Sequence, residues 1–201
     1  MKHYNYFIAV LLLLPVLMGC HKRQFFEDRD DPGLSRFTSR SYNTTTAYIN
    51  GKAWISGFSS LSGADPTDIF LDNNTIGKDT LSIRWSGGFG LTSSFGSSIT
   101  FSLPVKANFT RNDLLDWSNK RFPADTTTVT VFYNGRSPNS GSFVSGRGTG
   151  KIYFVNIASM PVDQNGSSPG IRISGLFEGN IGDSVIISKG RFDYNVRPLL
   201  P

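Results

Sequence analysis

Cysteine and histidine are nearly absent from this chain of 201 residues. The one cysteine is Cys20, and the two histidines, His3 and His21, lie at the amino-terminal end. A single cysteine has no partner for an intramolecular disulfide. Because neither residue type occurs after His21, the body of the chain cannot supply a Ser-His-Asp or Cys-His catalytic set, or a zinc site built on histidine or cysteine ligands.

Long hydrophobic runs are also scarce, and the longest is too short to cross a membrane. Phe7 to Met18 contains about a dozen mostly apolar residues, whereas a spanning helix needs about 20. Lys2 precedes the run, and charge returns at Lys22 and Arg23 just after it. A short basic start and an apolar core of this length are typical of a cleaved secretion signal. We therefore expect residues 1–19 to be a signal peptide.

The tetrapeptide Leu17-Met18-Gly19-Cys20 at the end of this run resembles the lipobox of bacterial lipoproteins. In such proteins the cysteine sulfur receives a diacylglycerol, the chain is cut before the cysteine, and the new amine is usually acylated. Met18 departs from the small residue that is commonest at its position, but Gly19 keeps a small side chain beside the cleaved bond. The resemblance implies lipidation of Cys20. Acyl chains contribute roughly 0.8 kcal/mol per buried CH₂, so more than one chain anchors a protein durably in a membrane.

The charge balance does not favour a nucleic-acid partner. The formal net charge is +5, and removal of the signal peptide takes away one lysine. Basic residues cluster only at Lys22-Arg23 and Lys120-Arg121, and the sequence has no nucleic-acid-binding motif. We interpret the remaining basic side chains as parts of solvated strand faces and loops.

Residues 20–42 are predicted to form the lipidated amino terminus and a flexible tether. Side chains of both charge signs occur between Glu27 and Asp31, where Arg29 lies among four acids, and small polar residues follow. A chain of this kind and length has a root-mean-square reach of about 25 Å. Phe25, Phe26 and Phe37 are apolar side chains in this stretch that can touch the domain or the bilayer surface.

Residues 43–201 are predicted to form a single all-β domain. Asn50-Gly51 lies between two strand-like segments and is the strongest short-range signal for a hairpin. Alternation of apolar and polar residues then recurs along the chain. Roughly nine short strands joined by Gly, Ser and Asn turns favour an antiparallel β-sandwich, with a β-barrel as the alternative. Thr110 is placed to cap one short helix over Arg111 to Trp117.

Glycine-rich stretches mark the predicted irregular regions. Gly87–Ser98 and Gly135–Gly150 are predicted to be mobile loops. The last part of the second stretch, Ser145–Gly150, does not follow a strand and open a helix as a phosphate-binding loop must, so we interpret it as a hairpin loop. Gly175 and Gly190 interrupt predicted strands, which indicates bulges or bends.

A family resemblance rests on the lipobox and on stretches of alternating hydrophobicity punctuated by glycine. These stretches are Ala47–Trp54, Ile99–Pro104, Ile171–Phe177 and Gly190–Asp193. On these residues the chain resembles a family of small Bacteroidetes lipoproteins of unknown function. The resemblance spans most of the mature chain and implies an envelope location and a β fold. The family has no established catalytic residues, so the resemblance implies no chemistry.

The body of the chain lacks histidine and cysteine but contains aspartate and glutamate, so carboxylates are the catalytic groups that it can supply. Glycoside hydrolysis needs two of them, so a carbohydrate-active hydrolase is the alternative function. Most of the aspartates occupy positions that turn chemistry explains. Glu178 and Asp193 lie in or beside predicted strands and form the one pair to inspect, although nothing in their spacing requires acid-base catalysis.

A ligand-binding surface is the other possibility. Trp117 lies outside any predicted strand, and an exposed indole beside polar donors can stack on a sugar ring. Arg136 and Arg147 lie in the predicted mobile loops and can present cations to a glycan or to another acidic envelope partner. The sequence thus predicts a lipid-anchored, non-catalytic lipoprotein of the cell envelope, at the outer membrane, without cofactor or metal. The membrane face and the oligomeric state stay open.

Overall fold

The structure is a computed structural model, and it leaves parts of the chain undescribed. The predicted signal peptide, Cys20 and Arg136 lie outside the described residues. The described residues are 26–40, 42–56, 67–72, 79–89, 97–133, 144–161, 170–182, 184–196 and 200.

These residues form ten strands and one short helix. The strands belong to a single antiparallel sheet, and the helix, α2 (Arg111–Leu115), lies against β8. The strands are β1 (Thr44–Ile49), β2 (Lys52–Ser56), β3 (Thr67–Asp72), β4 (Asp79–Phe89), β5 (Ser97–Val105), β6 (Arg121–Phe122), β7 (Thr128–Tyr133), β8 (Val144–Ser159), β9 (Ile171–Ile181) and β10 (Val185–Val196).

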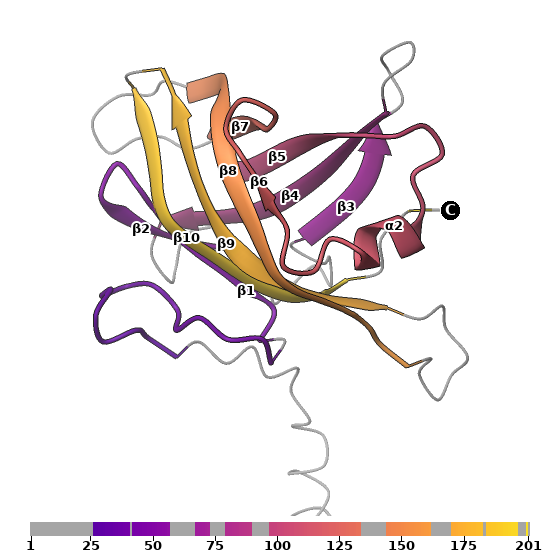
Figure 1. Ribbon diagram of the computed structural model, residues 1–201. Coiled ribbons are helices and arrows are strands. Elements are labelled where there is room, and N and C mark those ends of the chain that lie inside the picture. Colours follow the sequence, from indigo (N-terminus) through magenta and orange to yellow (C-terminus); the bar gives the residue numbers. More distant parts are fainter. Residues whose placement is uncertain are drawn as a thin grey trace, which may run out of the picture.

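Eight of the strands close into an antiparallel barrel (Figure 1). The last strand, β10, pairs with the first, β1, and β2 pairs with β4 through Trp54 opposite Phe89. Strand β3 follows β2 along the same edge of β4, and β6 pairs with β8. The all-β prediction is confirmed, and the architecture is the barrel alternative. Closure removes the free edges that an open sheet would expose.

Two local predictions are confirmed. Asn50 and Gly51 join β1 to β2 with positive φ angles of 50° and 75°, as a two-residue hairpin turn requires. Thr110 caps α2: its hydroxyl accepts from Asp113 N at 3.4 Å, and the Asp113 carboxylate accepts from Thr110 N at 2.9 Å. The hydrogen bond from Lys106, followed by those from Thr110, lowers the pKa of Asp113 to about 2.

Within the described residues, no helix is long and apolar enough to span a membrane.

Aromatic rings fill the interior of the barrel. Trp85 of β4 stacks on Phe177 of β9 with ring centroids 5.0 Å apart, and it contacts Phe192 of β10 at 5.1 Å and Phe101 of β5 at 5.9 Å. All four side chains are buried. Side chains of alternate residues point inward along each strand, so the apolar alternation in the sequence becomes one packed core.

The predicted loop over Ser145–Gly150 is wrong, because these residues belong to β8. A side chain at Gly148 would overlap the carbonyl oxygen of Asn180, and one at Gly150 would lie 2.6 Å from Phe101. The glycines occupy alternate positions where the neighbouring strand and the core leave no space. The predicted loop from Gly87 is also shorter than expected, because β4 continues to Phe89. The predicted irregularity at Gly190 is a register shift between β10 and β9.

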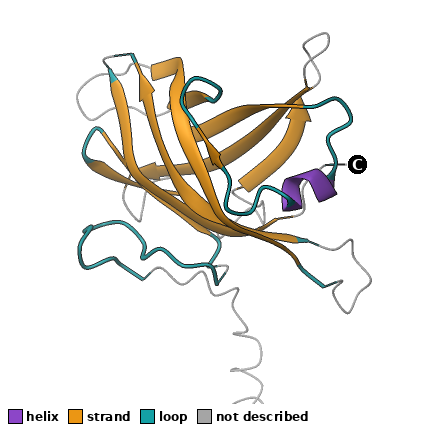
Figure 2. Ribbon diagram, in the orientation of Figure 1, coloured by secondary structure: helices purple, strands orange, loops and turns teal. Residues whose placement is uncertain are grey.

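Residues 26–40, predicted to be part of a flexible tether, lie against the barrel, and we call this segment the strap (Figure 2). Leu34 is fully buried, and Ser35 N donates to Thr46 Oγ1 of β1 at 3.2 Å. The Tyr48 hydroxyl of β1 donates to the carbonyl oxygen of Pro32 at 2.8 Å. The folded unit therefore includes residues well before the predicted boundary at residue 43.

Candidate functional site

A groove of about 890 Å³ crosses the outer face of the barrel over β8, β9 and β10. Its walls come from the strap on one side and from β6 with the following residue on the other. The lining residues are Phe37, Arg121, Phe122, Pro123, Lys151, Ile152, Tyr153, Leu176, Phe177, Glu178, Lys189, Gly190 and Arg191. The groove is therefore mostly apolar in its floor and cationic at its rim.

The floor follows from strand register. Tyr153 of β8 lies opposite Leu176 of β9, which lies opposite Arg191 of β10. The neighbours Ile152 and Phe177 are buried in the core, so Tyr153 and Leu176 must face outward. Leu176 is 41% exposed, which is unusual for a leucine in the middle of a sheet. This places an accessible apolar surface at the centre of the groove.

Cationic side chains lie beside this floor. The Arg121 guanidinium sits 4.7 Å from the centre of the Tyr153 ring, a cation–π contact. Lys151 lies opposite Glu178 in the register of β8 and β9. Of the residues that the structure describes, neither Arg121 nor Lys151 forms a salt bridge. Both charges are thus available to a ligand.

Arg191 and Lys189, the other two cations of the groove, have a structural role, because they form salt bridges with the strap. Arg191 Nη1 donates to Asp28 at 2.6 Å, Arg191 Nη2 donates to Asp31, and Lys189 Nζ donates to Asp31 at 2.5 Å. The backbone N–H of Asp30, followed by Arg191, lowers the pKa of Asp28. The hydrogen bond from Lys189 and the Arg191 guanidinium lower that of Asp31.

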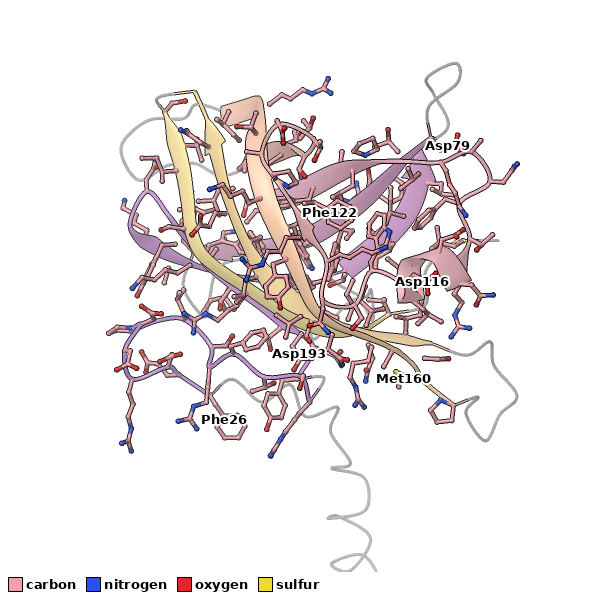
Figure 3. All side chains as sticks on the ribbon, viewed as in Figure 1. Phe26, Asp79, Asp116, Phe122, Met160 and Asp193 are labelled. Carbon is pink, nitrogen blue, oxygen red and sulfur yellow. The ribbon has the colours of Figure 1, made fainter. Side chains whose placement is uncertain are left out.

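Trp117, predicted as an exposed platform for a sugar, is buried. Its side chain is 7% exposed and belongs to the main core. Its ring lies 4.4 Å from that of Phe122, 5.0 Å from that of Phe109 and 5.6 Å from that of Phe154. Phe122 is labelled in Figure 3, on the strand that pairs with β8. The tight turn after α2 directs the indole inward, so its faces are covered by other rings.

The structure does not bring the predicted ligand-binding residues together. Arg147 is exposed in β8, opposite Thr130 of β7. Phe154, which Trp117 contacts, is seven residues further along β8, a distance of roughly 24 Å. With Arg136 outside the described residues, no shared cleft joins Trp117 and Arg147.

The two carboxylates of the predicted pair are also separated. Glu178 and Ser174 are both in β9, and Asp193 of β10 lies opposite Ser174. Four residues of strand place the two carboxylates roughly 14 Å apart, whereas glycosidase pairs are about 5 to 9.5 Å apart. Asp193 is 5% exposed and accepts from Thr38 Oγ1 of the strap at 2.5 Å. It positions the strap on β10.

Sequence reasoning missed the groove, although part of its signal was present. Tyr153 and Leu176 occupy positions that strand alternation assigns to the outer face, where an apolar residue has no core to join. That they lie side by side depends on the pairing of β8 with β9, which the sequence does not reveal. Among the described residues, no group of three or more His, Cys, Asp or Glu can hold a metal ion.

Comparisons of the chain with family models, with curated proteins and with solved structures found no match.

Proposed function

We propose that this protein is a lipid-anchored, non-catalytic protein of the bacterial cell envelope, held at the outer membrane through Cys20, and that its groove binds an acyl-chain anion. The observation that carries the binding function is the exposed Leu176 beside Tyr153, with Arg121 and Lys151 lining the same groove and outside every salt bridge among the described residues. The lipobox resemblance of Leu17–Cys20 supports the anchor.

An acyl-chain anion suits the groove better than a sugar does. A hydrocarbon chain gains about 25 cal/mol for each Å² of apolar surface that it buries, and Leu176, Tyr153 and Phe122 offer such a surface. An anionic head group pairs with Arg121 and Lys151 at the rim. A sugar stacks on an open aromatic face, but the Arg121 guanidinium already lies over the Tyr153 ring.

The separation of Glu178 from Asp193 supports the non-catalytic part of the proposal over a carbohydrate-active hydrolase. Glu178 faces Lys151 across the strand pair, and Asp193 is engaged by Thr38. Turnover of an oligosaccharide that is lost in a Glu178→Gln variant would contradict this part of the proposal.

The binding function is tested by titrating the purified protein with three probes. Oleate, kept below its aggregation concentration, has both a negative charge and a hydrocarbon chain. Dodecyl maltoside has a hydrocarbon chain but no charge, and an oligogalacturonate has negative charge but no hydrocarbon chain. We expect calorimetry to show one bound oleate and at least tenfold weaker binding of the other two. Tighter binding of the oligogalacturonate would favour an acidic glycan and overturn the acyl-chain assignment.

A matched pair of variants locates the site. Leu176→Glu places a carboxylate in the floor of the groove, whereas Ile186→Glu makes the same change at an exposed residue of β10 that does not line it. Oleate binding should fall at least tenfold in the first variant and stay unchanged in the second. Equal losses in both would show that the groove is not the site.

The anchor is tested separately in cells. Replacing Cys20 by Ser should abolish metabolic labelling with palmitate and release the protein from the membrane fraction. Unchanged labelling and fractionation would contradict the anchor but would leave the result with oleate intact.

A further inference from the structure

Docking of the strap changes the charge that it presents. In the sequence the strap has nearly balanced charge, but Asp28 and Asp31 are engaged by Arg191 and Lys189 of β10. The other two acids of the strap are Glu27 and Asp30. The Glu27 carboxylate accepts a hydrogen bond from the backbone N–H of Gly33 at 2.7 Å. The outer surface of the docked strap is therefore more basic than its composition suggests.

The basic side chains of that surface are exposed. Arg29, Arg36 and Arg40 are all exposed, and none of them forms a salt bridge with another described residue. Three cations thus face solvent from one short segment, and two of its four acids, Asp28 and Asp31, are engaged by the barrel.

An exposed aromatic ring lies among them. Phe26 is 49% exposed, and its ring centre lies 5.4 Å from that of Tyr42. The backbone N–H of Arg36 donates to the carbonyl oxygen of Phe26 at 2.6 Å, and Phe26, Arg36 and Tyr42 line one small pocket. We call Phe26, Arg36, Arg40 and Tyr42 the basic-aromatic patch. Phe26 is labelled in Figure 3 at the margin of the molecule.

The patch lies close to the proposed anchor along the chain. Phe26 follows Cys20 by six positions, and six residues span at most about 20 Å when fully extended. Lys22 and Arg23 are among the residues between them. A lipid on Cys20 would consequently hold Phe26 of the patch within about 20 Å of the bilayer.

We propose that the basic-aromatic patch binds the surface of an anionic bilayer, with the rings at the level of the head groups and the arginines on lipid phosphates. Aromatic rings with polar neighbours favour the membrane interface, and basic side chains are attracted to anionic lipid. The site's position in the cell rests on the lipid anchor of the proposed function, but its affinity for lipid does not. The patch would orient the barrel on the membrane through a second point of contact, which a lipid attached at Cys20 alone does not supply.

The test uses the full chain with Cys20→Ser, which carries no acyl group. Co-sedimentation is measured with vesicles of phosphatidylcholine alone and with vesicles that also contain phosphatidylglycerol. We expect binding to the mixed vesicles only, weakened by salt, and weakened about fivefold by each arginine that is removed. Equal binding to both kinds of vesicle, or to neither, would overturn the proposal.

Matched variants locate the contact. Arg36→Glu with Arg40→Glu should abolish vesicle binding, whereas Arg147→Glu with Lys120→Glu makes the same change in charge at exposed residues elsewhere and should have a much smaller effect. Leu176→Glu blocks the groove and should leave vesicle binding unchanged. Loss in the second double variant equal to that in the first, or loss in Leu176→Glu, would overturn the assignment to the patch.

Discussion

Arg191 lies on the outer face of β10, where its guanidinium meets Asp28 and Asp31 of the strap. Both aspartates have a pKa below the ordinary value of 3.8. A lowered pKa in the folded state means that the charged form stabilises docking. This stabilisation is complete above the ordinary pKa and is lost as the pH falls through the lowered value.

We therefore predict that the strap detaches at acid pH before the barrel unfolds. The methyl resonances of Leu34, which is fully buried under the strap, should broaden or shift below about pH 4, while those of Ile83 in the core stay in place. An Arg191→Met variant should show the detached signal at neutral pH as well. Leu34 resonances that stay unchanged in acid and in the variant would contradict this role for the ion pairs.

Residue type alone carries little information about such roles. Asp193 is one of many acids in the sequence, and only the structure shows that it receives the Thr38 hydroxyl. Trp117 also illustrates the limit: its polar neighbours suggest exposure, but its ring packs against Phe154 of β8, far along the chain, as well as against the nearer Phe109 and Phe122. Burial of this kind depends on tertiary contacts that no local pattern contains.

At the scale of elements, β8 shows what glycine does in a strand. Gly148 and Gly150 lie where an added Cβ would collide with the backbone of β9 or with Phe101. The close approach of β9 to this part of β8 thus requires residues without side chains. The same spacing of glycines suggested a loop from the sequence, since glycine weakens most strands.

We predict that Gly148→Ala lowers the free energy of unfolding by at least about 2 kcal/mol, because the β8–β9 pair must separate to admit the methyl group. Thr149→Ala, the adjacent substitution at an exposed position, should cost less than about 1 kcal/mol. Urea denaturation of the two variants measures the difference. Equal midpoints would show that β8 tolerates a side chain at position 148.

Elements that depend on neighbouring residues could be predicted, and those that depend on pairing could not. The Asn50-Gly51 turn and the Thr110 cap are determined within a few residues, and both are present. The groove requires Tyr153 to lie beside Leu176, which are more than twenty positions apart in the sequence. The difference between a sandwich and a barrel depends on the pairing of β2 with β4, which closes the sheet.

At the scale of the whole molecule, β10 completes the structure. It pairs with β1 and β9, it contributes Phe192 to the core, and it supplies the cations that hold the strap. Removing it opens the barrel at two strands and uncovers the aromatic interior.

We predict that a chain ending at Ser184 shows no cooperative unfolding in urea. A peptide corresponding to β10 should restore the transition when added in trans, because it offers the missing backbone partners to both edges. A peptide of the same composition in scrambled order should not. A cooperative unfolding transition in the shortened chain alone would show that the barrel folds without β10.

The pairing of the first barrel strand with the last also determines when the barrel can close as the chain is made. Thr46 of β1 meets Arg191 of β10, so a chain that is synthesised and exported from its amino terminus passes most of its length before β1 has its partner. Contacts between such distant residues form slowly. If the chain is exported as proposed, β1 would therefore stay without its partner during the passage, and closure of the barrel would wait for the arrival of the final strand.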